Sequence, residues 1–295
     1  MFIVVESGST KADWMIINEK KEMPHSTIGF NPYFHSKQDI LIELNNNLEL
    51  DLIKDDVEEI FFYGAGCSIL SLNKIIEEGL GEYFTNAKIN VNHDLNASAY
   101  ACYQNKPVIA CILGTGSNSC LYDGKSISEK VPALGHILGD EGSGCYFGKK
   151  LLTDFLYNKL PNEINKEFLS IGLNKEIIIE NVYRKPNANV YIASFMPILL
   201  RNKNIEYSQK LIFQGLELFI ENHVKCFDNY SEKEISFVGS VAYLLKDELE
   251  KICLLNDLKI GKIIRRPLEQ LVSYHKHKLE KVQKKLSFQR SDQLN

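Results

Sequence analysis

Two loops rich in glycine and hydroxyl side chains are the parts of the sequence best suited to chemistry. The first is ESGSTKAD, residues 6–13, and the second is LGTGSNS, residues 113–119. Each follows an apolar run and offers several backbone N–H groups in a small space, an arrangement that can bind an anion such as a phosphate. One such loop alone would indicate a turn as well as a phosphate cradle, because glycine and serine also favour turns.

The two loops lie in a pattern that occurs twice. FIVVESGSTKADWMIINEK, residues 2–20, and VIACILGTGSNSCLYDGK, residues 108–125, both read as strand, hydroxyl-rich loop and strand. A Walker-type phosphate loop instead leads from a strand into a helix and ends in Gly-Lys-Ser/Thr. The repeat favours the cradle, since two duplicated halves would turn matching loops toward one cleft and one polyphosphate.

Three further segments carry candidate functional groups. Asp94 stands just before an Ala-rich helical run, where it could act as a base or only cap the helix. Residues 139–144, GDEGSG, precede an apolar helix, whose first N–H groups we expect to be bare and able to hold an anion or hydroxyls; Asp140 could also simply cap it. Gly239-Ser240 is expected to form a corner between a strand and a helix, a geometry that can bring the backbone close to a flat nucleotide base.

Short apolar runs alternate with helical patterns along the chain, which predicts an α/β fold with a mixed sheet. The expected strands are 2–5, 14–17, 23–28, 60–63, 89–91, 108–113, 119–122 and 235–238. The expected helices are 40–48, 75–84, 97–103, 147–160, most of 163–235, and 242–252.

Composition limits the class of protein. The 295 residues are 44% hydrophobic, enough for two domains. The net charge is −4, but residues 276–295 carry +4, so the acidic remainder is a poor binder of nucleic acid. With no apolar run of membrane-spanning length and no leader pattern, we expect a cytoplasmic protein that does not bind membranes.

Cysteine and histidine patterns indicate no metal centre. The seven cysteines contain no C-x-x-C pair and lie mostly in apolar runs, as buried free thiols do. His275 and His277 form an H-x-H pair without a third ligand, which we expect to be a chance pair in a solvated segment. The tail, residues 276–295, is predicted to be an exposed helix or disordered.

Taken in order, ESGSTKADW, HDLNASA, LGTGSNS with LGDEGSG, and FVGSVA resemble the bacterial N-acetylglucosamine kinase and BadF/BadG/BcrA/BcrD-type ATPase family. This family lies in the superfamily of sugar kinases, actin and heat-shock chaperones. The resemblance spans residues 1–275. It implies the actin-like ATPase fold, in which two ribonuclease-H-like α/β domains flank a nucleotide cleft. The expected division is an N-terminal domain 1–107, a C-terminal domain 108–275 and a basic tail 276–295.

The resemblance also implies roles for single residues. Asp94 matches the catalytic carboxylate. The β-phosphate of ATP would be held by Gly8, Ser9, Thr10 and Lys11. The γ-phosphate would face Gly114, Thr115, Gly116 and Ser117. Adenosine would pack on Gly239 and Ser240. Sugar hydroxyls would be bound by Asn31 and Asp140 together with Gly116 and Ser117.

The first loop departs from the family pattern at two positions. Glu6 stands where the family usually has an aspartate that organises Mg²⁺ through water, and Ala12 replaces a residue that often carries a hydroxyl. Glu6 keeps the charge but moves the carboxylate by one methylene, so we expect a Mg²⁺ ion held through water with altered geometry.

The resemblance implies an ATP-dependent kinase that phosphorylates a primary hydroxyl of an amino sugar, such as N-acetylglucosamine or a related N-acetylated hexose. Two alternatives stay open. One is an ATPase activator of a CoA-ester dehydratase or reductase, which needs cysteines for an iron–sulfur cluster, with Cys145 as a candidate. The other is a sensor that binds nucleotide or sugar without turnover. The expected partner is a small-molecule sugar, and either a homodimer or a monomer is compatible with the sequence.

Overall fold

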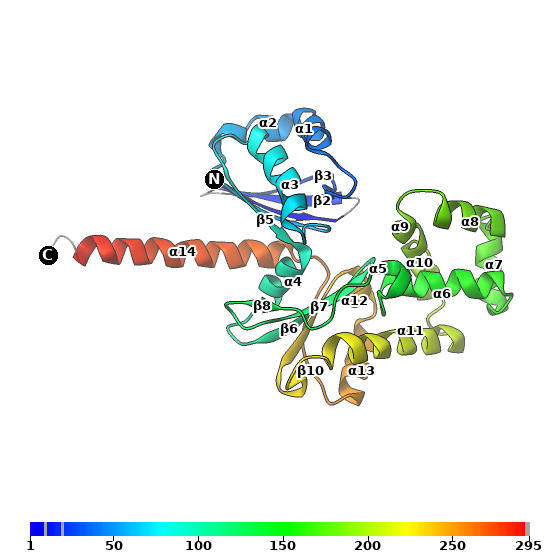
Figure 1. Ribbon diagram of the computed structural model, residues 1–295. Helices are drawn as coiled ribbons and strands as arrows, with labels where there is room; N and C mark the ends of the chain where they lie inside the picture. The colour runs from blue at the N-terminus through cyan, green and yellow to red at the C-terminus, as the bar shows by residue number, and fades with distance from the viewer. Residues whose placement is uncertain (9–10, 19–20, 293–295) are drawn as a thin grey trace. The chain divides into compact units, whose positions relative to one another are not determined.

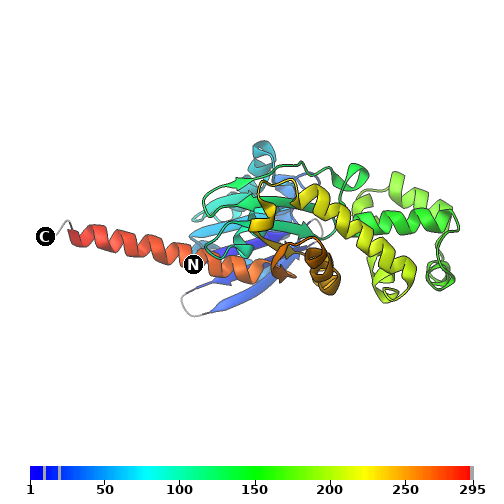
Figure 2. The ribbon, with the colours of Figure 1, turned by 90° about the horizontal axis from the view of Figure 1, so that it is seen from below.

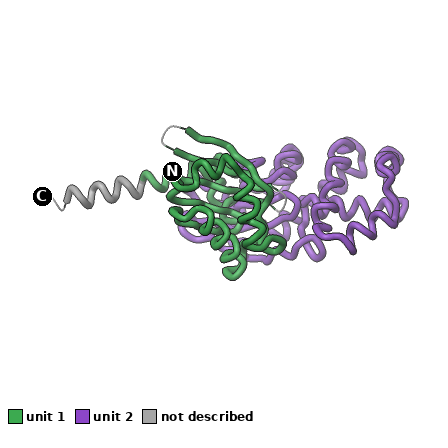
Figure 3. The backbone as a smooth tube through the Cα atoms, turned by 90° about the horizontal axis from the view of Figure 1, so that it is seen from above, with its two compact units in different colours: residues 1–101, 267–295 green, residues 102–266 purple. Residues whose placement is uncertain are grey.

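The computed structural model describes residues 1–8, 11–18 and 21–292, with side chains up to Glu280. It divides into two compact units, which Figure 3 colours separately: unit 1 is residues 1–101 with 267–295, and unit 2 is residues 102–266. Each unit contains one five-stranded mixed sheet, so the protein has the predicted α/β fold of two duplicated domains.

Unit 1 holds a sheet in the order β3-β2-β1-β4-β5. β1 and β2 are antiparallel, as are β2 and β3, whereas β4 and β5 run parallel to β1. The strands are β1 (Phe2–Ser7), β2 (Lys11–Ile17), β3 (Glu22–Ile28), β4 (Glu59–Gly64) and β5 (Lys88–His93). The helices are α1 (Lys37–Asn45), α2 (Leu48–Asp51), η1 (Lys54–Asp56), α3 (Leu70–Tyr83), α4 (Asp94–Cys102) and α14 (Leu268–Asp292).

Alternating residues of β1 supply both faces of this sheet. Ile3 and Val5 pack in the core beneath α1 and α3, whereas Val4 faces the other way and packs in a cluster with residues of α4 and α14. This alternation follows from the two-residue period of a strand, and helices on both faces explain why β1 is apolar on both.

Unit 2 repeats this topology with the order β10-β9-β6-β7-β8. β6 and β7 form the antiparallel hairpin, and β9 and β10 are parallel to β6. The strands are β6 (Val108–Leu113), β7 (Ser117–Tyr122), β8 (Ile127–Ser128), β9 (Glu234–Val238) and β10 (Lys259–Ile264). The duplication that the two loops predict is therefore present in the strand order.

The helices of unit 2 gather mainly between β8 and β9 in the chain, and α6 to α11 lie together beside the sheet (Figure 1). They pack with Ile109, Cys111 and Leu113 of β6 in one large core. The helices are α5 (Gly135–Leu138), α6 (Gly144–Leu156), α7 (Asn162–Ser170), α8 (Lys175–Tyr183), α9 (Ala188–Ala193), α10 (Met196–Arg201), α11 (Glu206–Phe219), the π-helix η2 (Ile220–Val224), η3 (Tyr230–Glu232), α12 (Ser240–Leu244) and α13 (Lys246–Leu255).

Helix α14 begins before the expected tail. It is one continuous helix that begins at Leu268 (Figure 2), and it therefore crosses the expected boundary at residue 276. Leu271 and Val272 are buried against the sheet of unit 1, so this helix belongs with that unit and not with the domain 108–275. An apolar face, not the basic charge of the segment, decides where the helix packs.

His275 was expected in a solvated pair, and this expectation is wrong. Its side chain is 2% exposed, its ring stacks on Phe61 with 3.7 Å between the ring centroids, and its Nε2 lies 2.8 Å from the Tyr63 hydroxyl oxygen. Burial, with the charge of Lys278, lowers the pKa of His275 to about 3. The imidazole is therefore a neutral core group, while His277 stays exposed.

The buried imidazole predicts a pH-dependent stability. Between pH 6.5 and 3 the unfolded chain takes up a proton at His275 that the folded chain does not, so stability is full above pH 6.5 and falls as the pH falls. At pH 5.5 we expect a loss of about 1.4 kcal/mol that His275→Gln abolishes. Urea unfolding at pH 7.0 and 5.5 measures it, with His277→Gln as the matched control. An unchanged pH slope in His275→Gln would contradict the assignment.

Among the described residues, no helix combines the length and the apolar character needed to cross a membrane.

Candidate functional site

The carboxyl ends of the parallel strands β1, β4 and β5 lie at the same end of the first sheet. Ser7 pairs with Gly64, and Gly64 with His93, so these strands end at the same level. The residues that follow, among them Gly8 and Asp94, therefore leave the sheet at this end. In α/β sheets ligands bind beyond the carboxyl ends of the strands, so this end of the sheet is the candidate site of unit 1.

The first loop closes a hairpin, as the sequence predicts. The Gly8 N–H donates to the Lys11 carbonyl oxygen over 3.0 Å. Ser9 and Thr10, which the sequence analysis assigns to phosphate, lie outside the described residues. Lys11 begins β2 directly after the loop, and its side chain is half exposed.

Two carboxylates stand next to this loop. Glu6 and Asp13 are directly opposite each other in the antiparallel register, so their side chains lie on one face of the hairpin. The Lys11 ammonium contacts the Asp13 carboxylate. One or two carboxylates beside phosphate oxygens are the usual protein ligands of Mg²⁺. The donor set therefore fits the ion expected at Glu6, and Asp13 is a second candidate that the sequence analysis did not name.

Asn31 and its neighbour Phe30 are held by contacts within their own segment and with two others. The Ser7 hydroxyl accepts the Phe30 N–H over 2.8 Å, and the Asn31 Oδ1 accepts the Tyr33 N–H over 3.0 Å. A Cβ on Gly66 would lie 2.6 Å from Asn31 Oδ1, and Gly66 has a φ of +85°. Gly66 is thus the residue that lets the amide approach the loop after β4, and no sequence motif marks this role.

Asp94 begins α4 and keeps an accessible carboxylate. Its side chain is 34% exposed, and its Oδ1 lies 3.0 Å from His93 Nε2. Burial, and next the charge of Asp94, raises the pKa of the Cys67 thiol to about 12. Asn31 approaches the loop after β4 at Gly66, and Asp94 follows β5, the strand that pairs with β4, so both residues lie beyond the carboxyl ends of the first sheet's strands.

In unit 2 the second loop lies in the equivalent position, after the carboxyl end of β6. The Gly114 N–H donates to the Gly116 carbonyl oxygen over 3.0 Å, which leaves Thr115 exposed at the tip. The Ser117 N–H donates to Asp140 Oδ1 over 3.1 Å, and a Cβ on Gly116 would lie 2.9 Å from that oxygen. Burial raises the pKa of Asp140, although the Ser117 N–H acts to lower it. Three of the predicted sugar-binding residues of unit 2 therefore meet at one point.

The N-terminus of α6 is not bare, which corrects the expectation from the sequence. The N–H groups of Gly144 and Cys145 donate to the carbonyl oxygens of Gly114 and Thr115 over 2.9 and 3.0 Å. Ser143, not Asp140, is the N-cap of the helix. The helix terminus thus anchors the second loop and leaves these N–H groups bonded within the protein.

Glu141 takes part in a contact that no sequence motif indicates. Its Oε1 accepts Asn222 Nδ2 over 3.2 Å, and its Oε2 lies 3.6 Å from His223 Nε2. Both partners belong to η2, and the Ser119 hydroxyl donates to the His223 carbonyl oxygen over 2.6 Å. Because Glu141 follows Asp140 directly, its contacts with η2 help to position the loop that carries Asp140.

The strand-to-helix corner at Gly239 is the third predicted element of unit 2. Gly239 has a φ of +125°, and a Cβ there would lie 2.3 Å from the Leu113 carbonyl oxygen. Ser240 is exposed and begins α12, one turn before Tyr243, whose ring carries the Arg265 guanidinium at 5.6 Å from its centroid. An exposed aromatic ring beside a close backbone approach suits a flat base.

The cysteines are almost all buried within the protein. All seven are free thiols, and only Cys226 is not buried. The Cys145 thiol donates to the Asn189 carbonyl oxygen over 3.2 Å, and burial raises its pKa to about 12. Within the described part of the chain no group of three or more His, Cys, Asp or Glu could hold a metal ion. The iron–sulfur alternative therefore gains no support from these residues.

Comparison with solved structures identifies relatives of the whole chain. A protein of Porphyromonas gingivalis, provisionally named an N-acetylglucosamine kinase, shares 34% sequence identity with a TM-score of 0.87, over 93% of this chain and 98% of that protein. A second provisional N-acetylglucosamine kinase, from Chromobacterium violaceum, shares 15% identity with a TM-score of 0.68, over 92% and 98% of the two chains.

A ROK family glucokinase from Streptomyces griseus, in complex with glucose and AMPPNP, shares the fold at 15% identity and a TM-score of 0.50, over 88% of this chain and 93% of that one. No protein-family model matches the sequence. A search of curated proteins also gave no match.

Proposed function

Because the chain belongs to the bacterial N-acetylglucosamine kinase and BadF/BadG/BcrA/BcrD-type ATPase family, we propose that it transfers the γ-phosphoryl group of ATP to a primary hydroxyl of an amino sugar. N-acetylglucosamine or a related N-acetylated hexose is the proposed acceptor. The observation that carries this proposal is the accessible Asp94 carboxylate, which directly follows the carboxyl end of β5 in the first sheet.

Asp94 would act as the general base. Phosphoryl transfer needs in-line positioning, charge neutralisation and a group that takes the proton of the attacking hydroxyl. The Asp94 carboxylate is exposed enough to reach a substrate, and its contact with His93 fixes its direction. Such a base contributes about 10²–10⁴ to the rate.

The two loops and the corner would hold ATP. In this proposal Gly8, Ser9, Thr10 and Lys11 bind the β-phosphate, and Gly114 to Ser117 face the γ-phosphate. Gly239 and Ser240 would pack on adenosine, with the exposed ring of Tyr243 beside them. The AMPPNP bound to the ROK glucokinase of the same fold supports ATP as the phosphoryl donor.

Glu6 and Asp13 would hold Mg²⁺ through water. When bound, such an ion would supply charge neutralisation to the phosphate groups of ATP. The protein would contribute two carboxylates on one face of the hairpin, and the Lys11 ammonium would reduce the repulsion between them.

Asn31 and Asp140 would orient the sugar. Both side chains are largely buried, and each is held by a backbone N–H bond, so they are positioned before substrate arrives. Preorganised polar groups of this kind give specificity because an ill-fitting sugar leaves them unpaired.

A coupled ADP-release assay over N-acetylated and plain hexoses tests the proposal. Sugar-stimulated ADP release, highest with an N-acetylated hexose, is the expected result. Absence of sugar-stimulated turnover with every hexose would overturn the kinase proposal, and calorimetric ATP binding without product would favour the sensor alternative.

Asp140→Asn should weaken sugar use without changing the backbone, because asparagine tolerates the φ of +62° found there. Losing a charged hydrogen-bond partner lowers kcat/KM for the sugar about tenfold to a hundredfold, while KM for ATP stays constant. Asp257→Asn is the matched control, since Asp257 is exposed at a φ of +55°. Equal effects of the two variants would remove Asp140 from the site.

A further inference from the structure

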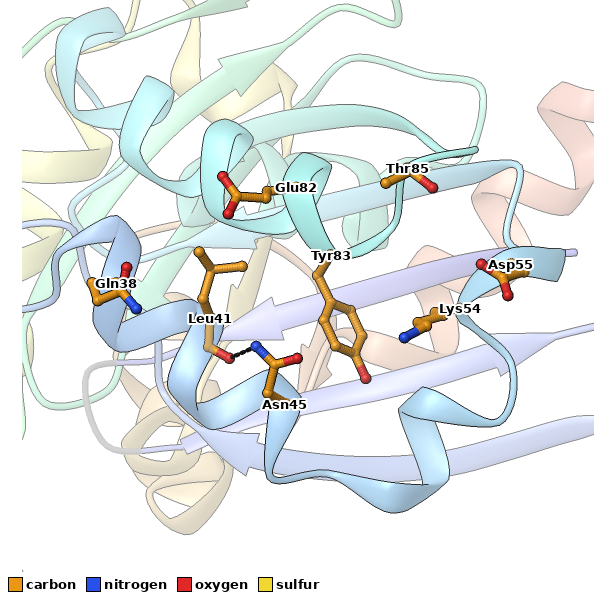
Figure 4. A pocket seen from close by; sticks show the side chains of 8 residues that line it. All are labelled: Gln38, Leu41, Asn45, Lys54, Asp55, Glu82, Tyr83 and Thr85. Carbon is orange, nitrogen blue, oxygen red and sulfur yellow. Dashed lines mark hydrogen bonds between the residues drawn. The ribbon is translucent and has the colours of Figure 1, made fainter.

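Unit 1 contains a cavity that is open to solvent and lies away from the candidate site, and five of its eight lining residues are exposed. It has a volume of about 460 Å³ and lies between α1, η1 and the C-terminal end of α3 (Figure 4). None of its lining residues belongs to the loops around Asp94 or Asn31. Small-molecule sites usually have volumes of about 300–1,000 Å³, so this cavity is large enough for a metabolite.

The lining is suited to a ligand with many hydroxyl groups. Amides of Gln38 and Asn45 and the Thr85 hydroxyl line the cavity, and Leu41 is its one aliphatic member. The Asn45 Nδ2 donates to the Leu41 carbonyl oxygen over 2.8 Å, which fixes the amide at the wall. Such a wall offers both donors and acceptors.

The Tyr83 hydroxyl is the strongest sign of a ligand. The side chain is 6% exposed, and its ring is held by an edge contact with Phe84 and by the Lys54 ammonium 5.4 Å from its centroid. The hydroxyl has no hydrogen-bond partner among the described residues, and Figure 4 shows it directed between Asn45 and Lys54. A buried hydroxyl without a partner costs about 1–3 kcal/mol, a cost that a bound polar ligand would remove.

The charges of the lining favour a cation. Lys54 is paired with Asp51 at 2.7 Å, and Glu82 with Lys37 at 2.6 Å, so both charges are compensated. Asp55 has no ion pair among the described residues, and α3 ends at the cavity with the negative pole of its dipole. An anion would find no uncompensated positive charge here.

We propose that this cavity binds a small hydroxylated organic cation, the chemistry of an amino sugar with a free amine. The ammonium group lies at Asp55, and a hydroxyl of the ligand bonds to the Tyr83 hydroxyl. The site is distinct from the proposed kinase site, and the proposal does not depend on the kinase activity.

Calorimetric titration of the full chain with D-glucosamine tests this site, with D-glucose as the uncharged probe of matched shape. We expect D-glucosamine to bind at least about tenfold more tightly than D-glucose, because only the amine pairs with a carboxylate. Asp55→Asn and Tyr83→Phe should each weaken D-glucosamine binding by about five- to tenfold. Asp56→Asn, at the neighbouring exposed position outside the lining, should bind as the wild type does.

Tyr83→Phe removes an unpaired buried hydroxyl, so the variant should be at least as stable as the wild type, and a binding loss cannot then be ascribed to unfolding. Asn31→Ala alters the proposed sugar site of the kinase and leaves the cavity unchanged, so this variant should retain D-glucosamine binding. The proposal is overturned by absent binding, by equal affinity for both probes, by full affinity in Asp55→Asn, or by loss in Asn31→Ala. Failure of the kinase proposal would appear in the ADP-release assay and leave these titrations unchanged.

Discussion

Asp94→Asn is expected to reduce kcat for sugar phosphorylation by about 10²–10⁴-fold, because the amide cannot accept the proton of the attacking hydroxyl. Affinity for ATP should change little, since Asp94 is not among the residues assigned to phosphate or adenosine. Steady-state ADP release measures kcat, and calorimetric titration with a non-hydrolysable ATP analogue measures affinity.

The substitution is conservative in structure. Asparagine has the shape of aspartate and is equally favourable at the start of a helix, so α4 should remain intact. His93→Gln is the companion variant and should lower kcat less than Asp94→Asn, because His93 contacts Asp94 and acts on substrate only through it. If Asp94→Asn lost activity and nucleotide affinity to the same extent, Asp94 would be a structural residue and not the base.

Gly239→Ala is expected to destabilise unit 2 by about 3–5 kcal/mol, combining backbone strain with overpacking. The Gly239 φ of +125° disfavours any side chain, and the new Cβ would lie 2.3 Å from the Leu113 carbonyl oxygen. Gly239 also donates its N–H to the Ile264 carbonyl oxygen over 2.9 Å, so it cannot move without disturbing β10. Chemical denaturation followed by circular dichroism measures the loss.

Gly172→Ala provides the control for strain alone. Gly172 has a φ of +71°, but a Cβ at this position would meet no atom within 4 Å, so the cost should be about 1–2 kcal/mol. The difference between the two variants isolates the close approach at Leu113. Similar losses in both would show that the contact beside the second loop is not tight.

Local pattern determined the two hairpins and their loops. A strand run, a short Gly/Ser-rich turn and a second run are contained within about twenty residues, so residues 2–17 and 108–122 were predictable from neighbours in the chain. The same local features placed Asp94 at the start of a helix and Gly239 at a strand-to-helix corner. Their assigned roles in catalysis and binding stay predictions.

Strand β10 was not predicted, because its pattern is weak and its stability comes from a distant partner. KIGKII contains a glycine and two lysines, and it pairs with β9 with a register shift between Ile260 and Ile263. A Cβ on Gly261 would lie 2.4 Å from the hydroxyl oxygen of the buried Ser236 in β9, so the neighbouring strand leaves little room for a side chain there. Pairing between strands separated in the chain is absent from local periodicity.

Tertiary packing alone decided three further features. It placed α14 with unit 1 and buried His275 beside Phe61, although the segment reads as a solvated basic tail. It also bonded the first N–H groups of α6 to the second loop, where the sequence suggested a bare helix terminus. The local sequence thus set which residues could form loops and turns. Contacts between distant segments set which polar groups stayed available to bind a ligand, because burial and hydrogen-bond pairing depend on partners far along the chain.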